Sequence, residues 1–296
     1  MIQGLEFGIS SNKVKISRNG QFLVISGTYK PVIKIFDIQQ QSIKCSRGTD
    51  NDIVDFEILT EDYQKMALLL QDRTVEIHDK GGKYFQTRIP RTPRVSCYDH
   101  LSSDLLIGSS SNEIYRLNLE EGTFFKPLEL STKGINKIIH NQMLDLVMAA
   151  SDEGMVSLVD FKSKNEVHLL NTFTGHPLTQ IIQGSNPFEF LIGSSEGIII
   201  HYDMRNHRPI QQTQHPYFLP INSLIPLKDQ NKLISVDQRQ IRVHSLDNFK
   251  EILMAFETST LTNDCVIIPD SGLLVTASED SKCGLYFVPS LGHAPK

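Results

Sequence analysis

The stretch Ile33-Lys34-Ile35-Phe36-Asp37 places apolar residues at alternating positions, as a half-buried β-strand does, and ends on a small polar residue. Six similar stretches follow it: Val75-Glu76-Ile77-His78-Asp79, Ile114-Tyr115-Arg116-Leu117-Asn118, Val156-Ser157-Leu158-Val159-Asp160, Ile199-Ile200-His201-Tyr202-Asp203, Ile241-Arg242-Val243-His244-Ser245 and Gly284-Leu285-Tyr286-Phe287-Val288. They end at positions 37, 79, 118, 160, 203, 245 and 288, so the spacings are 42, 39, 42, 43, 42 and 43 residues. A period of this length with strand-like content is typical of four-stranded propeller blades. The sequence therefore predicts seven blades.

The residues before each copy predict the other strands of a blade. Short apolar runs such as Met66-Ala67-Leu68-Leu69-Leu70 precede a turn-forming cluster and then the repeated stretch, which together indicate a β-hairpin. Such runs are too short for a helix, which needs about 10–12 residues. We therefore predict an all-β chain in which residues 1–296 form a single seven-bladed β-propeller.

The seventh repeat lacks a fourth strand. Only residues 289–296 follow its third strand, and they are rich in Pro and Gly. The N-terminal residues 2–7 precede the first blade and can supply the missing strand, which would remove an unpaired sheet edge. We expect this N-terminal strand to close the ring as the outer strand of blade 7.

Composition excludes several classes of protein. The net charge of −5 and the pI of about 6.1 argue against a surface that binds nucleic acid all over, although a local basic patch is compatible with them. Four cysteines are far apart and form no Cys-x-x-Cys pair, so free thiols are expected. No apolar run approaches the ~18 residues that span a membrane. We expect no cofactor, no metal and no small-molecule substrate.

The most suggestive polar segment is Thr87-Arg88-Ile89-Pro90-Arg91-Thr92-Pro93-Arg94, with three arginines among eight residues. Strand alternation places this connection between blades on the same face as the turns between second and third strands. The candidate contact residues for RNA or an acidic peptide are Tyr29, Lys30, Arg73, Arg88, Arg91, Arg94 and Tyr217. Arginines and lysines bind phosphate oxygens, and tyrosines stack on unpaired bases. The alternative interpretation is an ordinary solvated loop.

Acidic residues of blades 4, 5 and 7, among them Asp152, are expected on that same face, so it should be polarised. On the opposite face, Arg205 and Arg208 form a second and weaker candidate, for which an ordinary turn is the alternative interpretation. Histidines 78, 201 and 244 occupy equivalent positions in separate blades, where packing is the expected role. No catalytic motif such as Gly-x-Ser-x-Gly is present, so we expect no enzymatic activity.

The repeats resemble WD-repeat propellers along the whole chain, although the chain has no Trp and, among the expected blade entries, the Gly-His pair typical of that position stands only at Gly175-His176. A closer resemblance is to the nucleolar protein 10 family, also called the essential nuclear protein 2 family. The matching stretches are residues 27–31, 56–63, 87–90, 113–122, 219–221 and 286–292. Members of that family carry further residues around the propeller, so we expect flanking regions beyond this chain.

The resemblance implies a non-catalytic scaffold of the nucleus and nucleolus that assists small-subunit pre-rRNA processing, within the small-subunit processome. It implies contacts with other ribosome assembly factors and with pre-ribosomal RNA, made by a monomer within a large particle. No membrane partner is expected. A peptide-reading WD-repeat adaptor, such as a substrate receptor or a signalling hub, is the alternative.

Overall fold

The computed structural model describes residues 5–172, 174–206 and 208–293. These residues form 27 β-strands and one three-residue 3-10 turn, η1 (Lys228–Gln230), and no α-helix occurs among them. The described part of the chain thus contains no helix that could cross a membrane. The strands build seven antiparallel sheets, six of four strands and one of three, each made of consecutive strands. The prediction of seven all-β blades is confirmed.

Two compact units divide the chain: Met1–Pro90 with Thr258–Lys296, and Arg91–Glu257. The first unit holds blades 1, 2 and 7. Its strands are β1 (Ser10–Ile16), β2 (Phe22–Thr28), β3 (Val32–Asp37), β4 (Ser42–Gly48), β5 (Ile53–Ile58), β6 (Met66–Leu70), β7 (Thr74–Asp79), β8 (Gly82–Arg88), β25 (Thr262–Ile267), β26 (Leu273–Ser278) and β27 (Gly284–Phe287).

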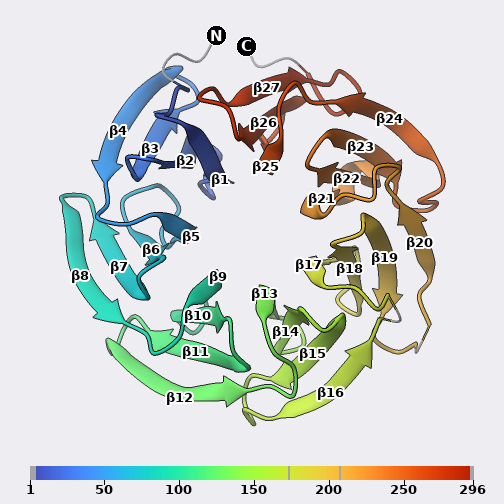
Figure 1. Ribbon diagram of the computed structural model, residues 1–296, viewed down its shortest axis with the longest axis horizontal. Helices are drawn as coiled ribbons and strands as arrows, with labels where there is room; N and C mark the ends of the chain where they lie inside the picture. The colour runs from blue at the N-terminus through green and yellow to red at the C-terminus, as the bar shows by residue number, and fades with distance from the viewer. Residues whose placement is uncertain (1–4, 173, 207, 294–296) are drawn as a thin grey trace. The chain divides into compact units, whose positions relative to one another are not determined.

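The second unit holds blades 3 to 6. Its strands are β9 (Pro93–Asp99), β10 (Asp104–Ser109), β11 (Glu113–Asn118), β12 (Thr123–Glu129), β13 (Ile135–Asn141), β14 (Leu146–Ser151), β15 (Met155–Asp160), β16 (Glu166–Asn171), β17 (Leu178–Gln183), β18 (Glu189–Ser194), β19 (Ile198–Asp203), β20 (Gln211–Gln214), β21 (Ile221–Leu227), β22 (Lys232–Asp237), β23 (Gln240–Ser245) and β24 (Ile252–Glu257). Within this unit the first strands β9, β13, β17 and β21 lie side by side (Figure 1).

Burial explains why the sequence pattern is so regular. Second strands such as β2, β6 and β10 are buried at most positions, and β6, which is buried at all five, reads as a continuous apolar run. Fourth strands such as β4 and β8 are mostly exposed, and their sequences are correspondingly polar. Between blades 3 and 4, the side chains of Leu106, Ile138 and Val147 belong to one apolar cluster. Stacking of blades therefore supplies the core.

Third strands end at Asp37, Asp79, Asn118, Asp160, Asp203, Ser245 and Phe287. The first six are the residues expected from the period, and the last lies one residue before position 288. The first strand of every blade also carries a register shift against the second. Such bulges increase the local twist of a sheet, so the repetition extends to this backbone detail.

The N-terminal segment pairs with the residues that lead into β27. Glu6 forms an antiparallel bridge with Lys282, flanked by hydrogen bonds from Phe7 N to Ser281 O (2.6 Å) and from Cys283 N to Leu5 O (3.1 Å). Leu5 and Phe7 are also buried in the apolar cluster of blades 1 and 7. Residues 2–4 of the expected closing strand lie outside the described residues, so a full outer strand over residues 2–7 stays a prediction.

Candidate functional site

Tyr29 and Lys30 occupy the turn between β2 and β3, and the Tyr29 side chain is 74% exposed. Together with Asp50 and Asp52, which lie between β4 and β5, they line a pocket of about 400 Å³. Lys30 has no carboxylate within ion-pair distance among the described residues of the chain. The positive charge of this turn is therefore available, although two aspartates lie close to it.

Arg73 and Arg88 are held near each other by pairing of β7 with β8. Thr74 pairs with Arg88, Ile89 N donates a hydrogen bond to Arg73 O (2.9 Å), and the Arg73 guanidinium donates one to the Pro90 carbonyl oxygen (3.2 Å). Ile89 is buried and anchors the connection, which leaves the Arg88 side chain exposed. The anchored backbone therefore presents Arg88 to solvent from a fixed position.

Arg94, at the start of β9, is engaged by blade 4. Its Nη1 lies 2.6 Å from Asp152 Oδ2 and 2.8 Å from Asn136 Oδ1, and the Asn136 amide donates a further bond to Asp152 Oδ1 (2.7 Å). The sequence placed Arg94 on a basic part of the face and Asp152 on an acidic part. The structure brings the two side chains into contact, so their charges compensate each other locally.

Arg91 has an exposed side chain, and none of the described carboxylates lies within ion-pair distance of it. It influences Tyr115, whose hydroxyl donates a hydrogen bond to Glu113 (2.6 Å). Burial and the Glu113 carboxylate raise the pKa of Tyr115 to about 12, whereas the Arg91 charge acts in the opposite direction. Because none of the described carboxylates pairs with it, the Arg91 charge is available to a binding partner.

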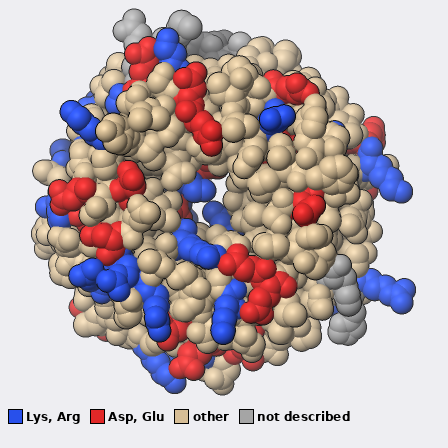
Figure 2. Space-filling view, viewed as in Figure 1, with Lys and Arg blue, Asp and Glu red and all other residues tan. Residues whose placement is uncertain are grey.

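Over blades 3 and 4, Lys and Arg side chains lie next to Asp and Glu side chains in Figure 2.

Tyr217 and Arg205 already bind protein groups, so they are less available to a binding partner than Arg88 and Arg91 are. The Tyr217 hydroxyl donates a hydrogen bond to Glu257, and this bond raises the pKa of Tyr217 above its usual value. Arg205 binds the Asp203 carboxylate through Nε (3.0 Å) and Nη2 (2.6 Å) and stacks 4.8 Å from the Phe188 ring centre. The Arg205 bond is the main cause that lowers the pKa of Asp203. Arg208 is exposed.

A polar network inside blade 6 was missed by the sequence analysis. His215 Nδ1 lies 2.8 Å from Asp237 Oδ2, and Ser235 Oγ lies 2.8 Å from His215 Nε2 and 3.1 Å from His244 Nε2. We call these four residues the blade 6 network. The four side chains are almost completely buried. The sequence carries one indication of this network, because His215 lies at the entry to blade 6, 20 residues before Ser235.

The pKa values within the blade 6 network reflect this burial. Burial alone would raise the pKa of Asp237, but hydrogen bonds from His215 and from the Arg239 and Gln240 amides hold it below its usual value. Burial lowers the pKa of His244 to about 4, although its bond to the Phe249 carbonyl acts in the opposite direction. His244 is therefore a neutral packing residue at physiological pH, as the packing interpretation of the third-strand histidines expected.

Seven consecutive meander sheets with this repeat define a seven-bladed β-propeller of the WD-repeat type. The crystal structure of the Myceliophteria thermophila Cps50 (Swd1) β-propeller domain superposes with a TM-score of 0.81, covering 95% of this chain and 98% of that one at 13% identity. At this identity the likeness shows the fold alone.

The chain belongs to the family described as Nucleolar protein 10-like, N-terminal domain, which it matches over residues 1–296. Nucleolar protein 10 of Xenopus tropicalis is 36% identical over 306 residues, and that of Homo sapiens is 33% identical; each alignment covers 100% of this chain and 44% of the relative. Ribosome biogenesis protein ENP2 of Saccharomyces cerevisiae is 35% identical over 100% of this chain and 43% of the relative. The chain thus spans less than half the length of these relatives. The family predicted from the six matching stretches is confirmed.

Proposed function

We propose that this chain is a non-catalytic scaffold domain in ribosome biogenesis, located in the nucleolus, that holds assembly factors and small-subunit pre-ribosomal RNA together. The observation that carries the proposal is the match along all 296 residues to relatives named Nucleolar protein 10 and Ribosome biogenesis protein ENP2. The peptide-reading adaptor is not favoured by these names. The processome as the particular particle is part of the proposal, as is the expectation that one copy acts within it.

The stacked blades support a scaffold, because their apolar cores fix the loops that partners would contact. Preorganised loops lose little conformational entropy on binding, which favours affinity. Lys30, Arg88 and Arg91 offer charges without an ion-pair partner among the described residues, and Tyr29 offers an exposed ring beside Lys30. These groups suit RNA phosphates and unstacked bases. Arg73, Arg94 and Tyr217 would contribute less, since each already binds a protein group.

The non-catalytic part of the proposal rests on burial. Ser235, His215 and Asp237 have the hydrogen-bond order of a hydrolase triad. However, Ser235 and Asp237 have no exposed surface, and His215 is 1% exposed. A substrate carbonyl would have to lie about 3 Å from the serine oxygen, which requires an open site. We therefore assign this network to stability.

The test is RNA crosslinking and sedimentation of the full-length tagged protein in cells. Arg88→Glu with Arg91→Glu should lower crosslinks to small-subunit precursor RNA about tenfold, because two phosphate contacts are replaced by repulsion. Arg94→Glu alone should have a smaller effect, since Asp152 already compensates that charge. Lys228→Glu with Lys250→Glu is the matched control, because both lysines are exposed, neither belongs to a candidate contact, and the change of charge is the same.

Equal losses of RNA crosslinks in the two double variants would mean that Arg88 and Arg91 have no special role in contacting RNA. Sedimentation with precursor particles but without RNA crosslinks would leave a scaffold that binds proteins only. A small RNA-free pool of wild-type protein would remove the ribosomal assignment altogether. Melting temperatures close to wild type are required of every variant, so that loss of fold is not mistaken for loss of contact.

A further inference from the structure

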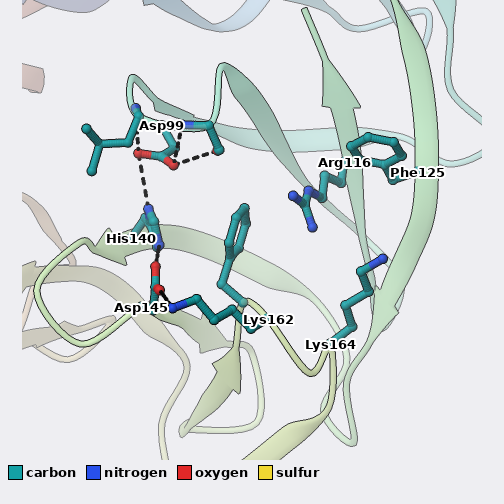
Figure 3. A pocket seen from close by; sticks show the side chains of 10 residues that line it. Asp99, Arg116, Phe125, His140, Asp145, Lys162 and Lys164 are labelled. Atoms are coloured by element: carbon teal, nitrogen blue, oxygen red, sulfur yellow. Dashed lines mark hydrogen bonds and ion pairs between the residues drawn. The ribbon is translucent and has the colours of Figure 1, made fainter. Parts of the chain in front are cut away.

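Blades 3 and 4 hold another candidate site, at the opposite end of β9 from Arg94. A pocket of about 510 Å³ lies where the β9–β10 and β13–β14 connections meet the β15–β16 connection (Figure 3). Arg94 stands near the start of β9 and Asp99 at its end, so the strand separates them by about 16 Å. The volume falls within the ~300–1,000 Å³ that is typical of ligand sites. No predicted site residue lines this pocket.

Arg116 forms a rigid, positively charged part of the wall. Its guanidinium lies 4.1 Å from the Phe161 ring centre and 5.0 Å from that of Phe125, and its Nε is 2.6 Å from the fully buried Asp104 carboxylate. Because this guanidinium occupies the two rings, they are poor platforms for a nucleobase, which needs an open aromatic face. The described residues of the wall therefore offer no open aromatic face to a nucleobase, and Asp104 already compensates the Arg116 charge.

Two lysines stand at the mouth of the pocket and differ in availability. Lys162 Nζ lies 2.7 Å from Asp145, which compensates its charge. Lys164 Nζ lies 5.9 Å from the Phe125 ring centre, and no carboxylate in the described part of the chain comes within ion-pair distance of it. The Leu101 side chain, 78% exposed, adds an apolar rim. Lys164 is thus the cation that an incoming anion would meet.

His140 is the second observation that points to a ligand. Its side chain is 4% exposed, with Nδ1 3.4 Å from Asp99 Oδ1 and Nε2 3.9 Å from Asp145 Oδ1 (Figure 3). Neither ring nitrogen has a hydrogen-bond partner among the described residues. A buried polar group without such a partner costs about 1–3 kcal/mol, so a bound group that supplies one is favoured.

Asp99 and Asp145 decide which kind of anion fits. Burial acts to raise the pKa of Asp99, but hydrogen bonds from Ser102, Gln142 and the Leu101 amide lower it to about 2, so it is ionised at physiological pH. Two carboxylates in the wall repel a chain of phosphates. Asp99 already accepts hydrogen bonds from protein groups, whereas the Asp145 side chain, which is 38% exposed, can accept one from a peptide N–H group. One acidic side chain on a peptide backbone satisfies both the free cation of Lys164 and the Asp145 acceptor.

We propose that the pocket between blades 3 and 4 binds a peptide segment of a partner protein, with an Asp or Glu side chain paired to Lys164 and an apolar side chain against Leu101. Peptide N–H groups reach the Asp145 carboxylate and the His140 ring. The inference is independent of the RNA contact proposed above, because none of the proposed RNA-contact residues lines this pocket, and Arg94 lies near the start of β9 whereas Asp99 lies at its end.

The experiment places the photocrosslinker p-benzoylphenylalanine at position 101 of the full-length protein in cells and sequences the attached segment. That segment is then synthesised with a fluorescent label, and its affinity for wild-type protein is measured by polarisation. We expect a segment with an acidic residue. Lys164→Glu in the protein, or Glu→Gln in the peptide, should each raise Kd about tenfold, the cost of losing one charge-assisted pair.

Lys250→Glu is the matched control, because Lys250 is exposed on the β23–β24 connection of the same unit and its substitution makes the same charge change. It should leave Kd unchanged. An RNA adduct at position 101 overturns the proposal in favour of a nucleic-acid site. The absence of any adduct, a segment without acidic residues, or equal effects of Lys164→Glu and Lys250→Glu also overturns it. None of these outcomes depends on the Arg88 and Arg91 variants.

Discussion

The blade 6 network and the Arg94–Asp152 pair are built from similar groups but lie in opposite environments. His215 and Asp237 have fully buried side chains, whereas Arg94 and Asp152 are 38% and 43% exposed. Their shortest contacts are comparable, 2.8 Å and 2.6 Å. The difference therefore lies in solvent, which screens the exposed pair and is excluded from the buried one. Distance alone does not identify the groups that hold the fold.

Within one unit, the buried network contributes to stability, whereas the exposed pair is accessible to a binding partner. A buried polar group must keep its partners, because losing one leaves an unsatisfied group away from water. An exposed ion pair exchanges its partner for water or for a ligand at small cost. We therefore expect substitutions in the blade 6 network to lower the free energy of unfolding strongly, and the Arg94–Asp152 pair to open when a partner offers a stronger anion.

The largest effect is expected from Asp237→Ala. The substitution leaves His215 buried without its carboxylate and frees the Arg239 and Gln240 amides that now bind Asp237. Breaking a buried pair costs about 3–5 kcal/mol in the free energy of unfolding. Urea unfolding of the variant would measure it. Asp152→Ala is the matched control and should cost less than about 1 kcal/mol; similar losses in the two variants would contradict the comparison.

A pH effect of somewhat smaller size should come from His244. Its pKa is about 4 in the folded chain, against 6.5 for an ordinary histidine. As pH falls below 6.5, the unfolded chain takes up this proton first, so stability is complete above 6.5 and declines down to pH 4. The decline should amount to roughly 2–3 kcal/mol.

Urea unfolding of wild type and of His244→Gln at several pH values would measure this decline. The variant should show a flatter pH dependence between pH 6.5 and 4, whatever its absolute stability. Asp99 does not titrate in this pH range. Its pKa is lowered from 3.8 to about 2, so the stability that its carboxylate contributes is lost only below pH 3.8. A variant slope equal to that of wild type would show that His244 is not the titrating group.

The parts of the molecule that the sequence predicts are those governed by local pattern. Second strands such as β6 are buried on both faces, so their apolar composition is visible in a few consecutive residues. Arg94 and Asp152 are 58 positions apart, and their contact depends on how blade 3 packs on blade 4. A one-dimensional pattern carries no information on such contacts. The same reason hid the pocket around His140, whose lining comes from three connections and from strands β9, β11, β12 and β13.

The sequence did not predict the blade 6 network for another reason. The chain has no Trp, and no glycine precedes His215, so two features typical of WD repeats are absent from this blade. The buried polar contacts of His215, Ser235 and Asp237 are present without them. Among the predicted site residues, exposure of Arg88 and Arg91 followed from the loop sequence. Pairing of Arg205 with Asp203, two positions away, was open to prediction from their proximity.

The smallest effect concerns the Arg94–Asp152 pair itself, measured by a double-mutant cycle of Arg94→Ala and Asp152→Ala. The coupling energy should be about 0.5 kcal/mol and should shrink as salt is raised, because both side chains reach solvent. A coupling energy above about 2 kcal/mol that does not change with salt would instead show that the pair behaves like the buried network. That result would also withdraw Arg94 from the proposed RNA contact, since a phosphate could not then displace Asp152. A weak coupling keeps Arg94 available at low cost, and Asp152→Ala should then strengthen RNA crosslinking.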